Sequence, residues 1–171
     1  MSDTNISVFQ ADVSADPVAI RIEGRASFQN SACLQDFIKA LLAQGRSRFS
    51  IDFNACTGMD STFLGVLAGI ALQVRKLSPP GHLVLSRLES RNLELVRNLG
   101  LHRILTIDSG TVPPPAAMSS QAIPCSDRSE LENAKVALQA HENLVEAEEA
   151  NRSKFEDVLH FLRKRIEEEK P

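Results

Sequence analysis

The residues with the most chemical potential in this sequence are a carboxylate and two hydroxyls in a row, Asp60, Ser61 and Thr62. They follow an alternating apolar segment at 48–53 and precede an apolar pattern with helical spacing that begins near Thr62. A side chain at such a junction can cap the helix, because its oxygen accepts hydrogen bonds from the free N–H groups of the first turn. The same N–H groups and the helix dipole favour negative charge, so the junction also suits a phosphate on Ser61.

Modification of Ser61 is better supported by the sequence than catalysis by it. A phosphate would add about −1.5 to −2 charges beside Asp60 and change what this surface binds. The sequence has no Gly-rich phosphate loop of the Walker type, no H-E-x-x-H and no G-x-S-x-G motif. Ser61 is next to a carboxylate rather than an evident base, which is typical of a hydroxyl that is acted upon. We therefore expect a binding protein and not an enzyme, with no cofactor and no metal.

The segments around this junction alternate between strand and helix patterns. The order is ββαβαβαβ, which predicts an α/β fold with a largely parallel or mixed sheet and right-handed crossovers. Gly65 and Gly69 lie on one face of the central helix and predict close packing against the sheet or a neighbouring helix. We expect strands at 5–10, 17–23, 48–53, 82–86 and 104–107, and helices at 32–43, 62–77 and 90–99.

Three segments, Ile51-Asp52-Phe53, Met59-Asp60-Ser61-Thr62 and Leu64-Gly65-Val66-Leu67, closely resemble the signature of STAS domains, specifically of the bacterial anti-sigma factor antagonists. The resemblance spans about residues 5 to 108. It implies a STAS-like α/β fold with a four- or five-stranded mixed sheet and helices mainly on one face. It also implies that the Ser61 loop is exposed at one edge.

The resemblance further implies a phosphorylation switch at Ser61. In that family, the Ser directly after the Asp is phosphorylated by a serine kinase that is also the anti-sigma factor, and a serine phosphatase restores it. Ser61 is the residue that matches. The unphosphorylated protein is expected to bind the kinase, and the phosphorylated protein to release it. The expected partner-binding residues are Asp60, Ser61, Thr62, Phe63 and Ser27.

Two of these positions depart from the family pattern. Phe63 stands where the family usually has Gly, and Ser27 where it often has Asp. If Phe63 is exposed it anchors the partner, and if it is buried it packs the start of the helix; we favour burial. The alternative function is a STAS subunit that is never phosphorylated and assembles with partners through its C-terminal helices.

The chain divides into three regions. We expect a STAS domain at 1–108, a Pro/Ser/Ala-rich linker at 109–126 and a helical extension at 127–171, since the last region has no Gly and no internal Pro. Capping boxes begin at Ser129 and at Ser153.

The extension carries one heptad frame, but its seam is polar in the middle, at His141, Glu148 and Arg152. A hairpin of two helices with a break near Asn151 and one long helix both remain open. Val158 and Phe161 widen the apolar face beyond a simple seam. We therefore place docking on this or another domain slightly ahead of a coiled-coil homodimer, and we read His141 as a helix-surface or interface residue rather than a metal ligand.

Composition excludes several partners and sites. The net charge of −3 and the absence of Trp and Tyr argue against nucleic-acid binding. No transmembrane run or signal peptide is evident, so we expect a cytoplasmic protein without a membrane partner. Cys33, Cys56 and Cys125 are far apart and indicate neither a disulfide framework nor a zinc site. Cys33 and Cys56 are expected to be small buried side chains.

Overall fold

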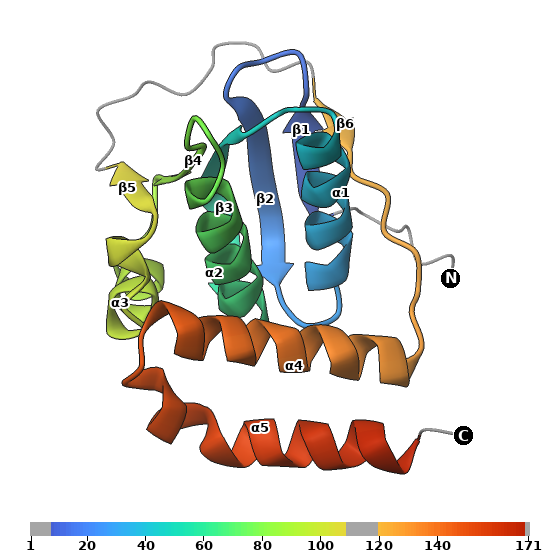
Figure 1. The fold of residues 1–171 in the computed structure, drawn as a ribbon. Helices are drawn as coiled ribbons and strands as arrows, with labels where there is room; N and C mark the ends of the chain where they lie inside the picture. The colour runs from blue at the N-terminus through green and yellow to red at the C-terminus, as the bar shows by residue number, and fades with distance from the viewer. Residues whose placement is uncertain (1–7, 109–119, 170–171) are drawn as a thin grey trace.

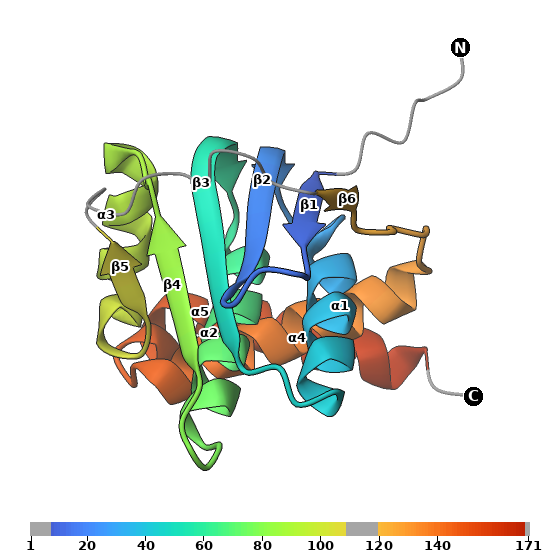
Figure 2. The ribbon, with the colours of Figure 1, turned by 90° about the horizontal axis from the view of Figure 1, so that it is seen from above.

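The computed structural model describes residues 8–108 and 120–169 and shows a mixed sheet with helices packed against it (Figure 1). The sheet has six strands in the order β5-β4-β3-β2-β1-β6, visible from above in Figure 2. Strands β2 to β5 pair in parallel, whereas β1 is antiparallel to both β2 and β6. The strands are β1 Phe9–Asp12, β2 Val18–Ala26, β3 Arg48–Met59, β4 His82–Ser86, β5 Thr106–Asp108 and β6 Gln121–Ala122.

Two helices, α1 and α2, lie side by side on one face of the sheet (Figure 1). Burial alternates along β2 because successive strand side chains point to opposite faces, and the α2 helix is buried along most of its length. These features confirm the predicted α/β fold and the central strand–helix junction. The helices are α1 Ser31–Ala43, α2 Ser61–Arg75, α3 Ser90–Asn98, a 3-10 turn at Leu101–Arg103, α4 Glu130–Ala147 and α5 Asn151–Glu168.

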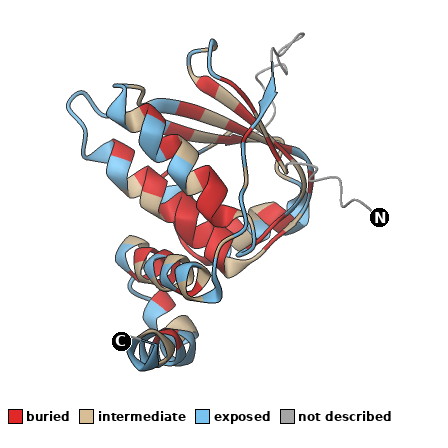
Figure 3. Cartoon of the chain, turned by 90° about the vertical axis from the view of Figure 1, so that its right-hand side faces the viewer, coloured by how far each residue is buried: buried red, intermediate tan, exposed pale blue. Residues whose placement is uncertain are grey.

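The two C-terminal helices form a hairpin across α2. α4 packs directly on α2, and α5 packs on the far side of α4 (Figure 1). In Figure 3 the buried residues gather where the helices meet the sheet, whereas the outermost helix, which ends at the C-terminus, is largely exposed. Asn151 begins α5 and is buried; its Nδ2 donates to the carbonyls of Leu99 and Leu144. Of the arrangements that the sequence left open, the structure therefore shows the hairpin with a break near Asn151 and not one long helix.

The segment at 109–126 was expected to be an extended linker, and its described part is not. Residues 109–119 lie outside the described residues, but Gln121 and Ala122 form β6 and pair with β1. Ile123 is buried in the core. The sheet therefore has six strands instead of the expected four or five. A strand of two residues is too short to show apolar alternation, so it gives no signal in the sequence. Its position is set by pairing with β1, which lies more than a hundred residues earlier.

The cysteine expectation was also wrong in part. Cys33, at the start of α1, forms a disulfide with Cys125, which follows β6, over a Cα–Cα distance of 5.2 Å. The pairing of β6 with β1 returns the chain to the side of the domain where α1 lies, which brings together two cysteines 92 residues apart. Cys56 is a free buried thiol, as predicted. None of the helices in the described ranges has the length and apolar character that a membrane crossing demands.

Candidate functional site

The carboxylate of Asp60 organises the junction between β3 and α2. It occupies the N-cap position with extended backbone, and its Oδ1 accepts a hydrogen bond of 2.9 Å from the N–H of Phe63. Its Oδ2 accepts a second bond of 2.8 Å from the N–H of Phe28, in the loop between β2 and α1. Of the two side chains that the sequence offers as a cap, Asp60 and Ser61, it is therefore Asp60 that caps α2, and it also holds a neighbouring loop against the start of that helix.

Asp60→Ala is expected to lower the free energy of unfolding by about 1–3 kcal/mol, because the variant leaves the Phe63 and Phe28 N–H groups without this acceptor. Asp60→Asn is expected to cost less, because an amide oxygen can still accept one of the two bonds. Urea denaturation followed by circular dichroism measures both effects. Asp127→Ala, at an exposed aspartate, is the control; if the Asp60 and Asp127 variants are equally stable, Asp60 has no capping role.

Ser61 is the first residue of α2 and is half-buried. Its Oγ lies 2.9 Å from Nε2 of His141 in α4. The Nδ1 of His141 lies 2.6 Å from the Ala137 carbonyl, which can only accept, so Nδ1 carries the proton in the neutral ring. Nε2 then accepts a hydrogen bond from the Ser61 hydroxyl. The predicted modification site is thus engaged by the C-terminal hairpin.

His141 is held firmly in this contact. Only 3% of the residue is exposed, and its ring meets the Phe155 ring of α5 edge-on, with a centroid separation of 5.1 Å. Of the two predicted positions for His141, helix surface or interface, the structure shows an interface, here within one chain. Sequence reasoning did not pair it with Ser61, because 80 residues separate the two.

Three of the five residues predicted to contact a partner are buried. Phe63 is fully buried between Phe9 and Phe53, with ring centroids 6.0 and 6.5 Å away. Ser27 is buried, and its Oγ and carbonyl accept bonds within the β2–α1 loop. In this conformation Phe63 and Ser27 offer almost no surface to a partner, and the favoured interpretation that Phe63 is buried is confirmed.

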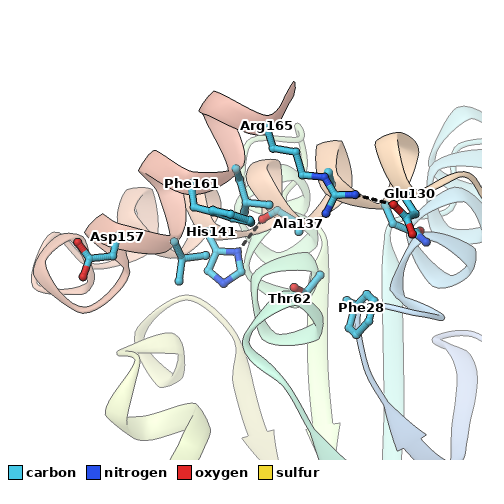
Figure 4. Close-up of a pocket in the computed structure, with 12 residues that line it drawn as sticks. Phe28, Thr62, Glu130, Ala137, His141, Asp157, Phe161 and Arg165 are labelled. Carbon is cyan, nitrogen blue, oxygen red and sulfur yellow. Dashed lines mark hydrogen bonds and ion pairs between the residues drawn. The ribbon is translucent and has the colours of Figure 1, made fainter. Parts of the chain in front are cut away.

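Thr62 is also buried, but it lines a groove beside Ser61. The groove has a volume of about 570 Å³ and lies between the β2–α1 loop, the start of α2 and the two hairpin helices (Figure 4). Phe28 and Phe161 line it and are 48% and 61% exposed. The widened apolar face at Val158 and Phe161 was the one sequence signal for this groove; Phe28 had none, because a single loop residue has no periodicity.

The contact between α2 and α4 depends on glycine. A Cβ added to Gly65 would lie 2.2 Å from the carbonyl oxygen of Ala140, and one added to Gly69 would lie 2.4 Å from Nδ2 of Asn143. That same Nδ2 donates to the Gly65 carbonyl over 3.2 Å. The predicted close packing at the two glycines is therefore against a neighbouring helix, and that helix carries His141.

Comparisons with known proteins agree with this architecture. A family model described as "Mlab, STAS domain" matches residues 9–106. Among solved structures, the fold is similar to the anti-sigma factor antagonist SpoIIAA in its unphosphorylated form, with a TM-score of 0.50 and 19% identity over 60% of this chain and 89% of that one. The Bacillus cell fate determinant SpoIIAA in the phosphorylated form matches with a TM-score of 0.49 and 18% identity, over 59% and 91% of the two chains. No curated protein matches the sequence significantly. At 19% identity, the likeness to the unphosphorylated form shows the fold alone.

Proposed function

The chain belongs to the STAS domain family, and from this premise we propose that it is a phosphorylation-switched protein-binding module of the anti-sigma factor antagonist type. With Ser61 unphosphorylated, it binds an anti-sigma factor serine kinase. With Ser61 phosphorylated, it releases that kinase, and a serine phosphatase restores the binding form. The observation that carries the proposal is the position of Ser61 as the first residue of a helix, directly after a capping carboxylate.

The charge at this position explains why phosphorylation would change binding. Asp60 already occupies the cap and accepts from the Phe63 N–H, so a phosphate on Ser61 competes with a carboxylate for the positive end of the helix. The phosphate brings about −1.5 to −2 charges next to an existing negative charge. A partner that fits the neutral hydroxyl therefore meets a larger group and a strongly negative surface.

Substitution of Ser61 tests this proposal in a partner capture experiment with cell extract from the native source. Wild type and Ser61→Ala are expected to retain a serine kinase, and Ser61→Asp to retain it at least ~10-fold more weakly, which corresponds to about 1.4 kcal/mol of binding free energy. Ser153→Asp, at an exposed serine in the first turn of α5, is the matched control and should bind as wild type does. Equal capture by Ser61→Asp and wild type would refute the switch.

The exposed apolar groove favours a second candidate, a STAS subunit that is never phosphorylated and assembles through its C-terminal helices. Phe161 and Val158 present apolar surface on α5, the helix farthest from the sheet. Intact-mass measurement of the native protein separates the two functions. A phosphate on Ser61 supports the switch, and its absence under every growth condition supports the assembly role.

A further inference from the structure

The α4–α5 hairpin covers the helix that presents Ser61. Ala140 and Leu144 of α4 belong to the same hydrophobic core as the sheet. At Gly65 the backbone of α4 approaches α2 so closely that there is no room for a Cβ. The hairpin therefore lies against the first two turns of α2, on the side from which His141 reaches Ser61.

This contact leaves no space for a phosphoryl group in the direction of α4. The imidazole of His141 occupies the position 2.9 Å from Oγ. It cannot swing away easily, because the Phe155 ring packs against it and Nδ1 is bonded to the carbonyl of Ala137. A kinase or a partner that takes the Ser61 hydroxyl must first break this bond, and the packing around the ring ties that step to movement of the hairpin.

Other contacts set how the hairpin can move. The two ends of α4 are attached to the domain: the Cys33–Cys125 disulfide and the Arg128–Asp36 ion pair hold the entry to α4, and Asn151 and Lys154 bond to the carbonyls of Leu99 and Asn98 near the turn. The α5 helix is held mainly by α4. Opening therefore separates α4 from α2 and breaks the bonds of Asn151 and Lys154 at the turn, while the disulfide keeps the chain before α4 anchored.

We propose that the α4–α5 hairpin is an autoinhibitory cover, and that Ser61 becomes available to a kinase or partner only when α4 moves off α2. This inference rests on the proposed function, because it regulates the same site. A partner that binds only the open form has its apparent affinity reduced by the fraction of molecules that are open. The cover thus sets how much kinase or partner is needed to bind Ser61.

Thiol labelling of the full chain tests the cover without any kinase. Thr62 lies one turn before Gly65 and is only 5% exposed even though it lines the groove, so the thiol introduced by Thr62→Cys should react with a bulky maleimide much more slowly while the hairpin is closed than when it opens. The second change, Gly65→Ala, places a methyl group against the Ala140 carbonyl and should speed labelling at least ~10-fold relative to Thr62→Cys alone. Gln73→Ala, at an exposed position on the same helix, is the matched control and should leave the rate unchanged.

The background thiols do not interfere with this measurement. Cys33 and Cys125 are joined, and burial raises the pKa of the Cys56 thiol, which reduces its reactive thiolate. Intact mass after labelling counts the modified thiols. Rates are divided by the rate in urea-unfolded protein, so that they report access rather than chemistry.

Hydrogen exchange of the unmodified protein provides a second test, which stands even if the Gly65→Ala chain does not fold. A cover that opens predicts faster exchange in α4 and α5 than in β2 and β3, through an opening smaller than global unfolding. The proposal is overturned if α4 exchanges as slowly as β3, or if a folded Gly65→Ala variant leaves the thiol at position 62 protected. If the hairpin is shown to open but wild type and Ser61→Asp capture the partner equally, the cover is supported and only the phosphorylation switch is refuted.

Discussion

Phe63→Ala is expected to lower the free energy of unfolding by about 3–5 kcal/mol, because it removes a fully buried aromatic side chain and leaves a cavity. The ring stacks on Phe9 and meets the edge of Phe53, so the loss affects contacts between the first turn of α2 and two strands of the sheet. Small domains are stable by about 5–15 kcal/mol, so a large share of the total is at stake. Urea denaturation followed by circular dichroism measures the change.

The matched control is a second phenylalanine at the same junction. Phe28 is 48% exposed and its N–H bonds to the same Asp60 carboxylate, but its ring lines the groove instead of the core. Phe28→Ala is expected to change stability by no more than about 1 kcal/mol. Under the proposed function, Phe28→Ala weakens partner capture. A Phe63→Ala variant that is as stable as wild type but has lost its partner would contradict the packing role and support the alternative that Phe63 contacts the partner.

Opening the Cys33–Cys125 disulfide is expected to have the second large effect. The bridge joins residues 92 positions apart, and a loop of that size corresponds to about 4–5 kcal/mol in the chain-entropy model, with 2–5 kcal/mol typical of measured losses. The double variant Cys33→Ser, Cys125→Ser should show this loss, and so should wild type in a dithiol reductant. Thermal and urea unfolding with and without the reductant measure it.

Cys56 provides the control for this experiment. It is a free thiol buried in the same domain, so Cys56→Ala should unfold with the same dependence on reductant as wild type. Equal stability of wild type in oxidising and reducing buffer would contradict a structural role for the bridge. The result also bears on location, because thiols are kept reduced in the cytoplasm, where we predict that the protein resides.

The hairpin is separate from the family match in sequence but not in packing. The match ends at residue 106, whereas Ala140 and Leu144 complete the core around α2. Removal of the chain beyond 108 would expose the glycine-lined face of α2 to water. The region described as an extension is therefore part of the folded unit, and any binding at Ser61 takes place beside it.

Local patterns in the sequence determined the parts of the site that lie within one strand–helix unit. The apolar alternation at 48–53 and the helical spacing after Thr62 predicted where α2 begins. An acceptor side chain at that position caps the helix, because the N–H groups that it satisfies lie within the first turn. Burial of Phe63, with its ring packing the start of the helix, was favoured over exposure. The STAS signature added the identity of the fold.

Only the tertiary structure decided what covers Ser61. The partners that matter are 80 residues apart for Ser61 and His141, and 92 for Cys33 and Cys125. The residues next to each of these side chains in the sequence do not indicate such contacts, because the contacts form only where β6 and the hairpin pack back against the domain. The heptad spacing in α4 and α5 predicted that these helices have an apolar face. The surface that α4 packs against is decided by Gly65 and Gly69 of α2, where the absence of a Cβ lets the two helices approach closely.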